Sequence, residues 1–245
     1  MKGFWATYLR ELLLLRKRFL RVLLSMSINP ILFILAFGIG LGRELYLEGR
    51  PYLEFLIPGL ISASSMLQAF AINVEINVAR FYLKVHEEFQ SAPISVVSFA
   101  LGEIFAGITK AFLSTFIILF ITLLLDKLSL KINFLFFIVV FLNAFIFASL
   151  GLASAMAIRA HSDQTLITNF IITPMMFLGG TFFPTNNLPN YIQPLVEILP
   201  LTLVSNTLRD LSWEKPLSIS NLLWLILLSI FSFLLALFTI KKAKD

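Results

Sequence analysis

Long stretches without a charged residue constrain this chain more than any other feature. Several run for about 20 residues and are rich in Leu, Ile and Phe, and a helix of that length spans the roughly 30 Å of bilayer hydrocarbon. Only 13% of the 245 residues are charged, about half the share of an ordinary soluble domain. These unbroken runs do not fit the alternating strands of a membrane barrel. The sequence therefore predicts an all-α integral membrane protein.

Six such stretches predict six transmembrane helices in a single domain. The segments between them are short, so no soluble domain of useful size fits, and the chain shows no convincing internal repeat. The predicted spans are 23–42, 55–77, 97–125, 132–157, 165–183 and 219–240.

Basic residues predict the orientation of these helices, because cytoplasmic flanks retain Lys and Arg. Of the 19 Lys and Arg residues, 12 fall on the side of the N-terminus, six fall on the other side, and Lys110 lies within a span. This bias predicts a multi-pass protein of the plasma (inner) membrane with both termini cytoplasmic, which requires an even number of crossings. Topology also explains the net charge of +5 without a nucleic-acid partner.

Residues 1–21, ahead of the first span, predict an amphipathic helix at the membrane interface. Apolar residues recur at steps of three and four along one helical face: Trp5, Tyr8, Leu12, Leu15 and Phe19. The opposite side carries Arg10, Lys17 and Arg21. Such a helix would turn its basic side towards lipid headgroups or a protein partner. A simple basic flank that sets topology is the alternative.

A polar segment, residues 80–95, joins the second and third spans on the predicted cytoplasmic side. It ends near a proline, which disfavours helix just before it. Its candidate partner-contact residues are Lys84, His86, Glu87, Glu88, Phe89 and Pro93. The segment predicts either a short helix across the membrane face or an ordinary solvated loop.

Helix breakers alternate with apolar residues in the segment 184–211, ahead of the last span. The residues that would interrupt a continuous helix in and just before this segment are Gly179, Gly180, Pro184, Pro189, Pro194 and Pro200. Such breakers divide the chain into short helices, which would dip into the outer leaflet where irregular backbone is packed in protein or lines a wet cavity. A plain extracellular loop is the alternative.

Three motifs resemble the ABC-2 type permease family. Gly-Gly-Thr-Phe-Phe-Pro at residues 179–184, with the Leu-Pro pairs that follow it and Arg209, is similar to that family's C-terminal signature. Pro58-Gly59 resembles its Pro-Gly element, and Ser-Ala-Pro-Ile-Ser at residues 91–95 resembles the end of its coupling segment. The resemblance covers nearly the whole chain.

The resemblance implies six transmembrane helices, an N-terminal interface helix, a cytoplasmic coupling helix in 80–95 and outer re-entrant helices in 184–211. It also implies a homodimer in membrane lipid, carried on two cytoplasmic ABC ATPase subunits that bind ATP and Mg²⁺, with no cofactor on this chain. The implied function is export of an amphipathic, lipid-linked, drug-like or polysaccharide substrate. Glu103 departs from the family pattern, in which a basic residue is expected.

The sequence itself supports a separate ATPase, because it contains no Gly-x-x-x-x-Gly-Lys-Ser/Thr loop to hold nucleotide phosphates. An ion-coupled secondary transporter, or a membrane binding protein without an ATPase, is the alternative. Such a transporter is expected to carry ionisable groups at the bilayer midplane. Glu103 and Lys110 lie well inside a span, on one helical face, and Lys110 can extend towards the cytoplasmic end. This arrangement favours a structural role for Glu103 and Lys110 over a role in ion coupling.

An intramembrane enzyme is disfavoured. Glu87-Glu88 is similar to the paired glutamates of a prenyl-protein protease family, but Ala92 stands where that motif has arginine. The two histidines, His86 and His161, fall in predicted cytoplasmic loops and so form no buried zinc site. The chain has no cysteine and no Gly-x-Ser-x-Gly elbow. We therefore expect a non-catalytic transmembrane subunit.

Overall fold

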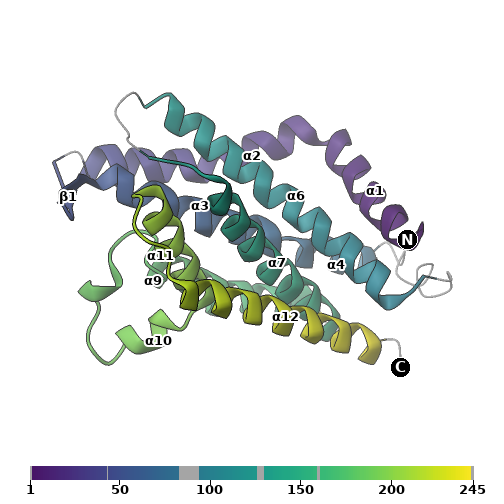
Figure 1. Cartoon of the computed structure of the whole chain (residues 1–245). Coiled ribbons are helices and arrows are strands. Elements are labelled where there is room, and N and C mark those ends of the chain that lie inside the picture. The colour runs from purple at the N-terminus through teal and green to yellow at the C-terminus, as the bar shows by residue number, and fades with distance from the viewer. Residues whose placement is uncertain (1, 43, 83–93, 126–129, 159–160, 244–245) are drawn as a thin grey trace.

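The computed structural model of the chain is an elongated bundle of helices (Figure 1). It describes residues 2–42, 44–82, 94–125, 130–158 and 161–243. The helix α1 (Lys2–Lys17) and the C-terminal part of α12 (Ile219–Lys242) lie at one end of the bundle, here called the terminus end. The strand β1 (Tyr46–Leu47) and the helices α10 (Gln193–Glu197) and α11 (Pro200–Ser212) lie at the opposite end, here called the hairpin end.

Five helical stretches of the described residues are long and apolar enough to cross a membrane. They are Phe19–Gly40, Tyr52–Phe81, Val96–Leu123, Phe134–Ala157 and Ile219–Lys242. Each lies within a few residues of a predicted span, so five of the six predicted spans have a matching helix. The elements that form the first four stretches are α2 (Phe19–Phe33), the π-helix η1 (Ile34–Leu41), α3 (Tyr52–Phe70), α4 (Ile72–Asn77), the π-helix η2 (Val78–Tyr82), α6 (Val96–Leu123) and α7 (Phe134–Ala157).

The predicted span at 165–183 corresponds to a helical stretch that is not among these five. It consists of α8 (His161–Ile167), the π-helix η3 (Thr168–Ile172) and α9 (Thr173–Leu178). Polar residues such as Gln164 and Asn169 lie in its first half, which makes it less apolar than the others. The helix ends before Gly180, whose φ of +76° is a conformation that glycine adopts without a steric penalty.

Side-chain caps fix where three of the long helices begin. Ser95, Asn133 and Ser218 precede α6, α7 and α12, and each accepts a hydrogen bond from the backbone N–H three residues later. The caps satisfy donors that have no partner within the first helical turn.

The second span is interrupted at Ala71, between α3 and α4. Two glycines of neighbouring helices lie against this break. A Cβ on Gly107 of α6 would be 3.1 Å from the carbonyl oxygen of Ala69, and one on Gly151 of α7 would be 2.8 Å from that of Phe70. Glycine at both positions therefore lets α6 and α7 approach the interrupted backbone closely.

A two-stranded hairpin follows the first span, although the sequence predicted helices alone. The strands β1 and β2 (Arg50–Pro51) are antiparallel. Glu48 and Gly49 between them both have positive φ, 52° and 76°, which is the backbone of a tight two-residue turn. The remaining short element is the 3-10 helix η4 (Thr185–Asn187).

Burial is uneven among the long helices. The second span is the most enclosed, at 83% buried, because α6, α7 and α11 pack around α3. The first and last spans are only 22% and 28% buried. Their apolar faces are therefore available to lipid or to another subunit.

Candidate functional site

Small residues bring α1 into close contact with α6. The hydroxyl of Thr7 is fully buried and donates to the carbonyl oxygen of Gly3 at 3.1 Å. A Cβ on Gly102 of α6 would lie 2.6 Å from the Cβ of Thr7. The hydroxyls of Tyr8 and Thr109 are 3.0 Å apart. The first turns of α1 are therefore packed against α6.

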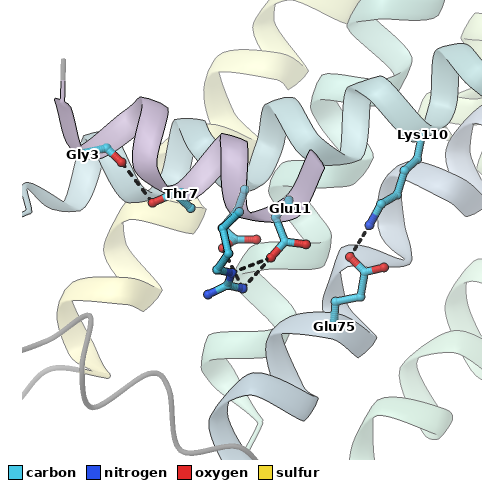
Figure 2. A network of polar contacts seen from close by, with 7 residues as sticks. Gly3, Thr7, Glu11, Glu75 and Lys110 are labelled. Carbon is cyan, nitrogen blue, oxygen red and sulfur yellow. Dashed lines mark hydrogen bonds and ion pairs between the residues drawn. The ribbon is translucent and has the colours of Figure 1, made fainter. Parts of the chain in front are cut away.

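Five charged side chains of α1, α4 and α6 form a charge cluster, in which Figure 2 labels Glu11, Glu75 and Lys110. Its first part consists of Arg10, Glu11 and Glu103. Glu11 and Glu103 are 3% and 2% exposed. The Nε of Arg10 donates to Oε1 of Glu11 at 3.0 Å, and its Nη2 lies 3.8 Å from Oε1 of Glu103. The guanidinium of Arg10 thus interacts with two buried carboxylates.

Lys110 of α6 and Glu75 of α4 complete the charge cluster with an ion pair (Figure 2). The side chain of Lys110 is 8% exposed and that of Glu75 is 46% exposed. The sequence allowed Lys110 to extend towards the cytoplasmic end of its span, and in the structure its ammonium pairs with the half-exposed Glu75. Glu103 and Lys110 share a helical face but have different ionic partners.

Buried amides connect α4 to two further helices. Asn73 Nδ2 donates to Ser154 Oγ of α7 at 2.8 Å, and Asn77 Nδ2 donates to Gln164 Oε1 of α8 at 2.9 Å. Asn77 also donates to Oδ1 of Asn73 at 2.6 Å. Side-chain bonds therefore join the short helix α4 to α6, α7 and α8.

The elements α4 and η2 lead into residues 83–93, which lie outside the described part of the chain. All six residues predicted to contact a partner fall there: Lys84, His86, Glu87, Glu88, Phe89 and Pro93. Their role stays a prediction. The described chain resumes at Ile94, one residue before the Ser95 cap of α6.

The N-terminal region differs from the predicted interface helix in two respects. The segment 1–21 is divided between α1 and α2, with the break at Arg18. The pattern also placed Arg10 on one face with Lys17 and Arg21, but Arg10 bonds to Glu11 and pairs with Glu103, while the other two are exposed. A cation beside buried carboxylates offsets part of the cost of burying their charge, which explains why Arg10 lies against Glu11 and Glu103.

A second site lies at the hairpin end, where the turn after α9 packs against α3. A Cβ on Gly59 would lie 2.5 Å from the carbonyl oxygen of Thr181. Ser205 Oγ donates to the carbonyl oxygen of Gly179 at 2.9 Å, and the Tyr52 hydroxyl donates to that of Phe182 at 2.6 Å. The Pro-Gly element, with Pro58 buried in α3, and the Gly-Gly motif are therefore neighbours.

Arg209 of α11 holds this turn against α3, and its contacts with Phe55, Gly180 and Asn206 form the Arg209 cluster. Its guanidinium donates to the carbonyl oxygen of Gly180 at 2.8 Å, to Asn206 Oδ1 at 2.9 Å and to the carbonyl oxygen of Phe55 at 3.4 Å. It also lies 3.7 Å from the centroid of the Phe55 ring. Burial lowers the pKa of Arg209 to about 10, so the group stays protonated near neutral pH.

The segment 184–211 folds as short helices that follow its prolines. Pro184 precedes η4, Pro189 lies ahead of α10, and Pro200 is the first residue of α11. Proline is favoured at the start of a helix because its missing N–H would have no helical partner there. The helix α11 packs against α3 and α7.

Sequence reasoning missed several residues of these sites. Asn73 and Asn77 stand four residues apart, one helical turn, so their shared face was a usable signal. Glu11 stands beside the run Leu12–Leu15, and an acidic residue at the edge of an apolar run is a weaker signal. No sequence signal pointed to Tyr52, because its hydrogen-bond partner Phe182 is distant in the sequence. No group of three His, Cys, Asp or Glu residues in the described ranges could hold a metal ion.

Comparison with known proteins places both sites within one family match. A family model described as "ABC-2 type transporter" matches residues 2–213. Nodulation protein J of Sinorhizobium fredii is 25% identical over 213 residues, 86% of this chain and 81% of that protein. The inner membrane transport permease YadH of Escherichia coli is 24% identical over 216 residues, 85% of this chain and 81% of that protein. The matched range includes the charge cluster and the Arg209 cluster.

Proposed function

Because the chain belongs to the ABC-2 type transporter family, we propose that this transport permease is the membrane subunit of an ATP-driven exporter. The family match over residues 2–213 carries the proposal. The proposed cargo is an amphipathic, lipid-linked, drug-like or polysaccharide molecule that leaves the cytoplasm along the interface of two copies. The outward apolar face of the last span, which is only 28% buried, supports contact with a second copy.

The proposal places ATP hydrolysis on two cytoplasmic ABC ATPase subunits, which would bind ATP and Mg²⁺. The chain itself has no phosphate-binding loop in its sequence, and such a loop is what cradles nucleotide phosphates in ATPases of this kind. The permease would contribute the path and the ATPase the energy.

The proposed contact with the ATPase is the segment from Lys84 to Pro93, within the predicted coupling segment 80–95. It connects η2 directly to α6, and α4 is bonded to α6 by Lys110 and Glu75 and to α7 and α8 by amides. A displacement of this segment would therefore act on α4 and, through these bonds, on α6, α7 and α8. Phe89 would supply the buried apolar anchor of the contact, and Glu87 with Glu88 would supply charges that tune association.

We also propose six crossings with both termini cytoplasmic. In Figure 1 the start of the chain and the end of α12 share the terminus end, which requires an even number of passes. The stretch from α8 to α9 covers residues 161–178, about 27 Å at 1.5 Å per residue, and supplies the sixth pass. The short helices of 184–211 would then be re-entrant at the extracellular face, held there by the Arg209 cluster.

This topology predicts opposite labelling of two exposed positions on either side of that stretch. The chain has no native cysteine, so single variants give no background. A membrane-impermeant thiol reagent added to intact cells is expected to modify Asn190→Cys, whereas Ala157→Cys should react only after permeabilisation. Lys242→Cys serves as the cytoplasmic control. Equal labelling of Asn190→Cys and Ala157→Cys in intact cells would rule out a crossing between them.

Purification of the chain from its native membranes in mild detergent tests the proposed function. We expect a nucleotide-binding chain to copurify, identified by mass spectrometry, and the complex to hydrolyse ATP. The buried charge cluster favours a second candidate, an ion-coupled transporter, because intramembrane ionisable groups often mark ion pathways. Purification of the permease without any such chain, together with transport driven by an imposed ion gradient, would establish that candidate instead.

A further inference from the structure

Four cationic side chains crowd the corner between α1 and α2. Arg16 and Lys17 end α1, Arg18 occupies the break, with φ −117° and ψ 14°, and Arg21 lies in the first turn of α2. All four are exposed. Figure 1 shows the chain changing direction between α1 and α2, so these side chains spread from a bend. We call these four residues the basic corner.

The basic corner has no anionic partner within the described part of the chain. No ion pair there includes any of its four residues. The nearest carboxylate in the sequence, Glu11, is buried and bonded to Arg10. Neighbouring cations of like charge repel one another, so an anion beside the basic corner would lower its electrostatic energy.

Apolar side chains flank the basic corner on both helices. Those at four-residue spacing, which places them along one side of each helix, are between 48% and 68% exposed: Trp5, Leu9 and Leu13 on α1, and Leu20, Leu24 and Ile28 on α2. The helix α2 begins the first membrane-spanning stretch, Phe19–Gly40, so the basic corner lies where a span meets the membrane surface. A phospholipid supplies an anionic headgroup together with hydrocarbon for the neighbouring faces.

We propose that the basic corner binds the headgroups of anionic phospholipids in the leaflet at the terminus end. Clusters of Lys and Arg beside a transmembrane helix attract anionic lipid, and here the cluster sits between two lipid-facing surfaces. The inference uses only the membrane location of the chain and is independent of any ATPase. Under the proposed topology this leaflet is the cytoplasmic one.

Lipid selectivity of the full chain in bilayers tests the proposal. Electron paramagnetic resonance with spin-labelled phosphatidylglycerol and phosphatidylcholine gives the relative association constant of the two lipids at the protein surface. We expect the wild type to prefer phosphatidylglycerol roughly fivefold. The variant Arg16→Gln, Arg18→Gln, Arg21→Gln should bring this ratio close to one, and salt near about 1 M should reduce the wild-type preference because it screens charge.

A variant with the same loss of charge at the other chain end is the matched control. Lys241→Gln, Lys242→Gln, Lys244→Gln also removes three cations, and it should keep most of the preference. Equal loss in both variants would attribute selectivity to net charge and overturn the site. A corner variant that keeps its lipid preference but no longer retains a protein partner would also overturn it, because the corner would then be a protein contact.

Discussion

Replacement of Arg209 with leucine is expected to lower the free energy of unfolding by about 3 kcal/mol, because the buried carbonyl oxygens of Gly180 and Phe55 lose a charged donor. Both carbonyls lie where the turn after α9 meets α3. In a chain of this size such a loss corresponds to a fall of roughly 10 °C in the apparent melting temperature. The drop can be measured by size-exclusion chromatography of detergent-solubilised protein after graded heating.

A second cation at the same end of the bundle provides the control. Lys215 pairs with Glu48 at 2.6 Å, and both side chains are exposed, so Lys215→Leu should change the melting temperature little. Arg209→Lys should fall between the wild type and Arg209→Leu, since lysine keeps the charge but cannot reach several acceptors at once. Equal stability of Arg209→Leu and Lys215→Leu would show that the Arg209 cluster does not hold the turn.

Loss of one partner of the Lys110 and Glu75 pair is expected to be asymmetric. Glu75→Gln leaves the buried ammonium of Lys110 without a counter-charge and should cost about 2 kcal/mol, less than a fully buried pair because Glu75 is half exposed. Lys110→Met leaves a carboxylate that water reaches, and should cost under about 1 kcal/mol. The double variant should lie close to the wild type, because no charge is left unpaired.

Thermal denaturation of the two single variants and the double variant gives this coupling energy directly. The exposed pair of Lys131 and Glu214 is the comparison, and Glu214→Gln should be nearly neutral. If Glu75→Gln proved no worse than Lys110→Met, the ammonium of Lys110 would not depend on Glu75 and the account of the charge cluster would be wrong.

The long helices were predictable because bilayer thickness sets their length and composition. Five predicted spans agree with the structure to within a few residues. The stretch from α8 to α9 was harder to place, since polar residues such as Gln164 weaken its apolar pattern while they bond to Asn77. A polar residue lowers the hydropathy of a predicted span, although in the folded protein it can form a hydrogen bond with another helix.

Partnerships between distant segments could not be predicted from periodicity. The pattern grouped Arg10 with Lys17 and Arg21, because periodicity shows neither that the adjacent Glu11 is buried nor that the distant Glu103 lies beside it. The motifs at Gly59 and Gly180 were recognised separately, but only the folded chain brings Gly59 against Thr181 and Gly180 against Arg209. Prolines such as Pro200, by contrast, are favoured at the first position of a helix, so the helix starts they mark could be predicted from the sequence.

We propose that a separate ATPase drives this membrane subunit through the segment from Lys84 to Pro93. The most direct test of this proposal is ATP hydrolysis per permease in complexes purified from wild type, a Phe89→Ala, Glu88→Ala double variant, and Lys242→Ala as a control in α12. We expect the control to match the wild type and the double variant to show roughly thirtyfold less ATP hydrolysis per permease, because loss of an interface anchor weakens binding of the ATPase by about that factor. A double variant that retains the ATPase and hydrolyses ATP at the wild-type rate would contradict the claim.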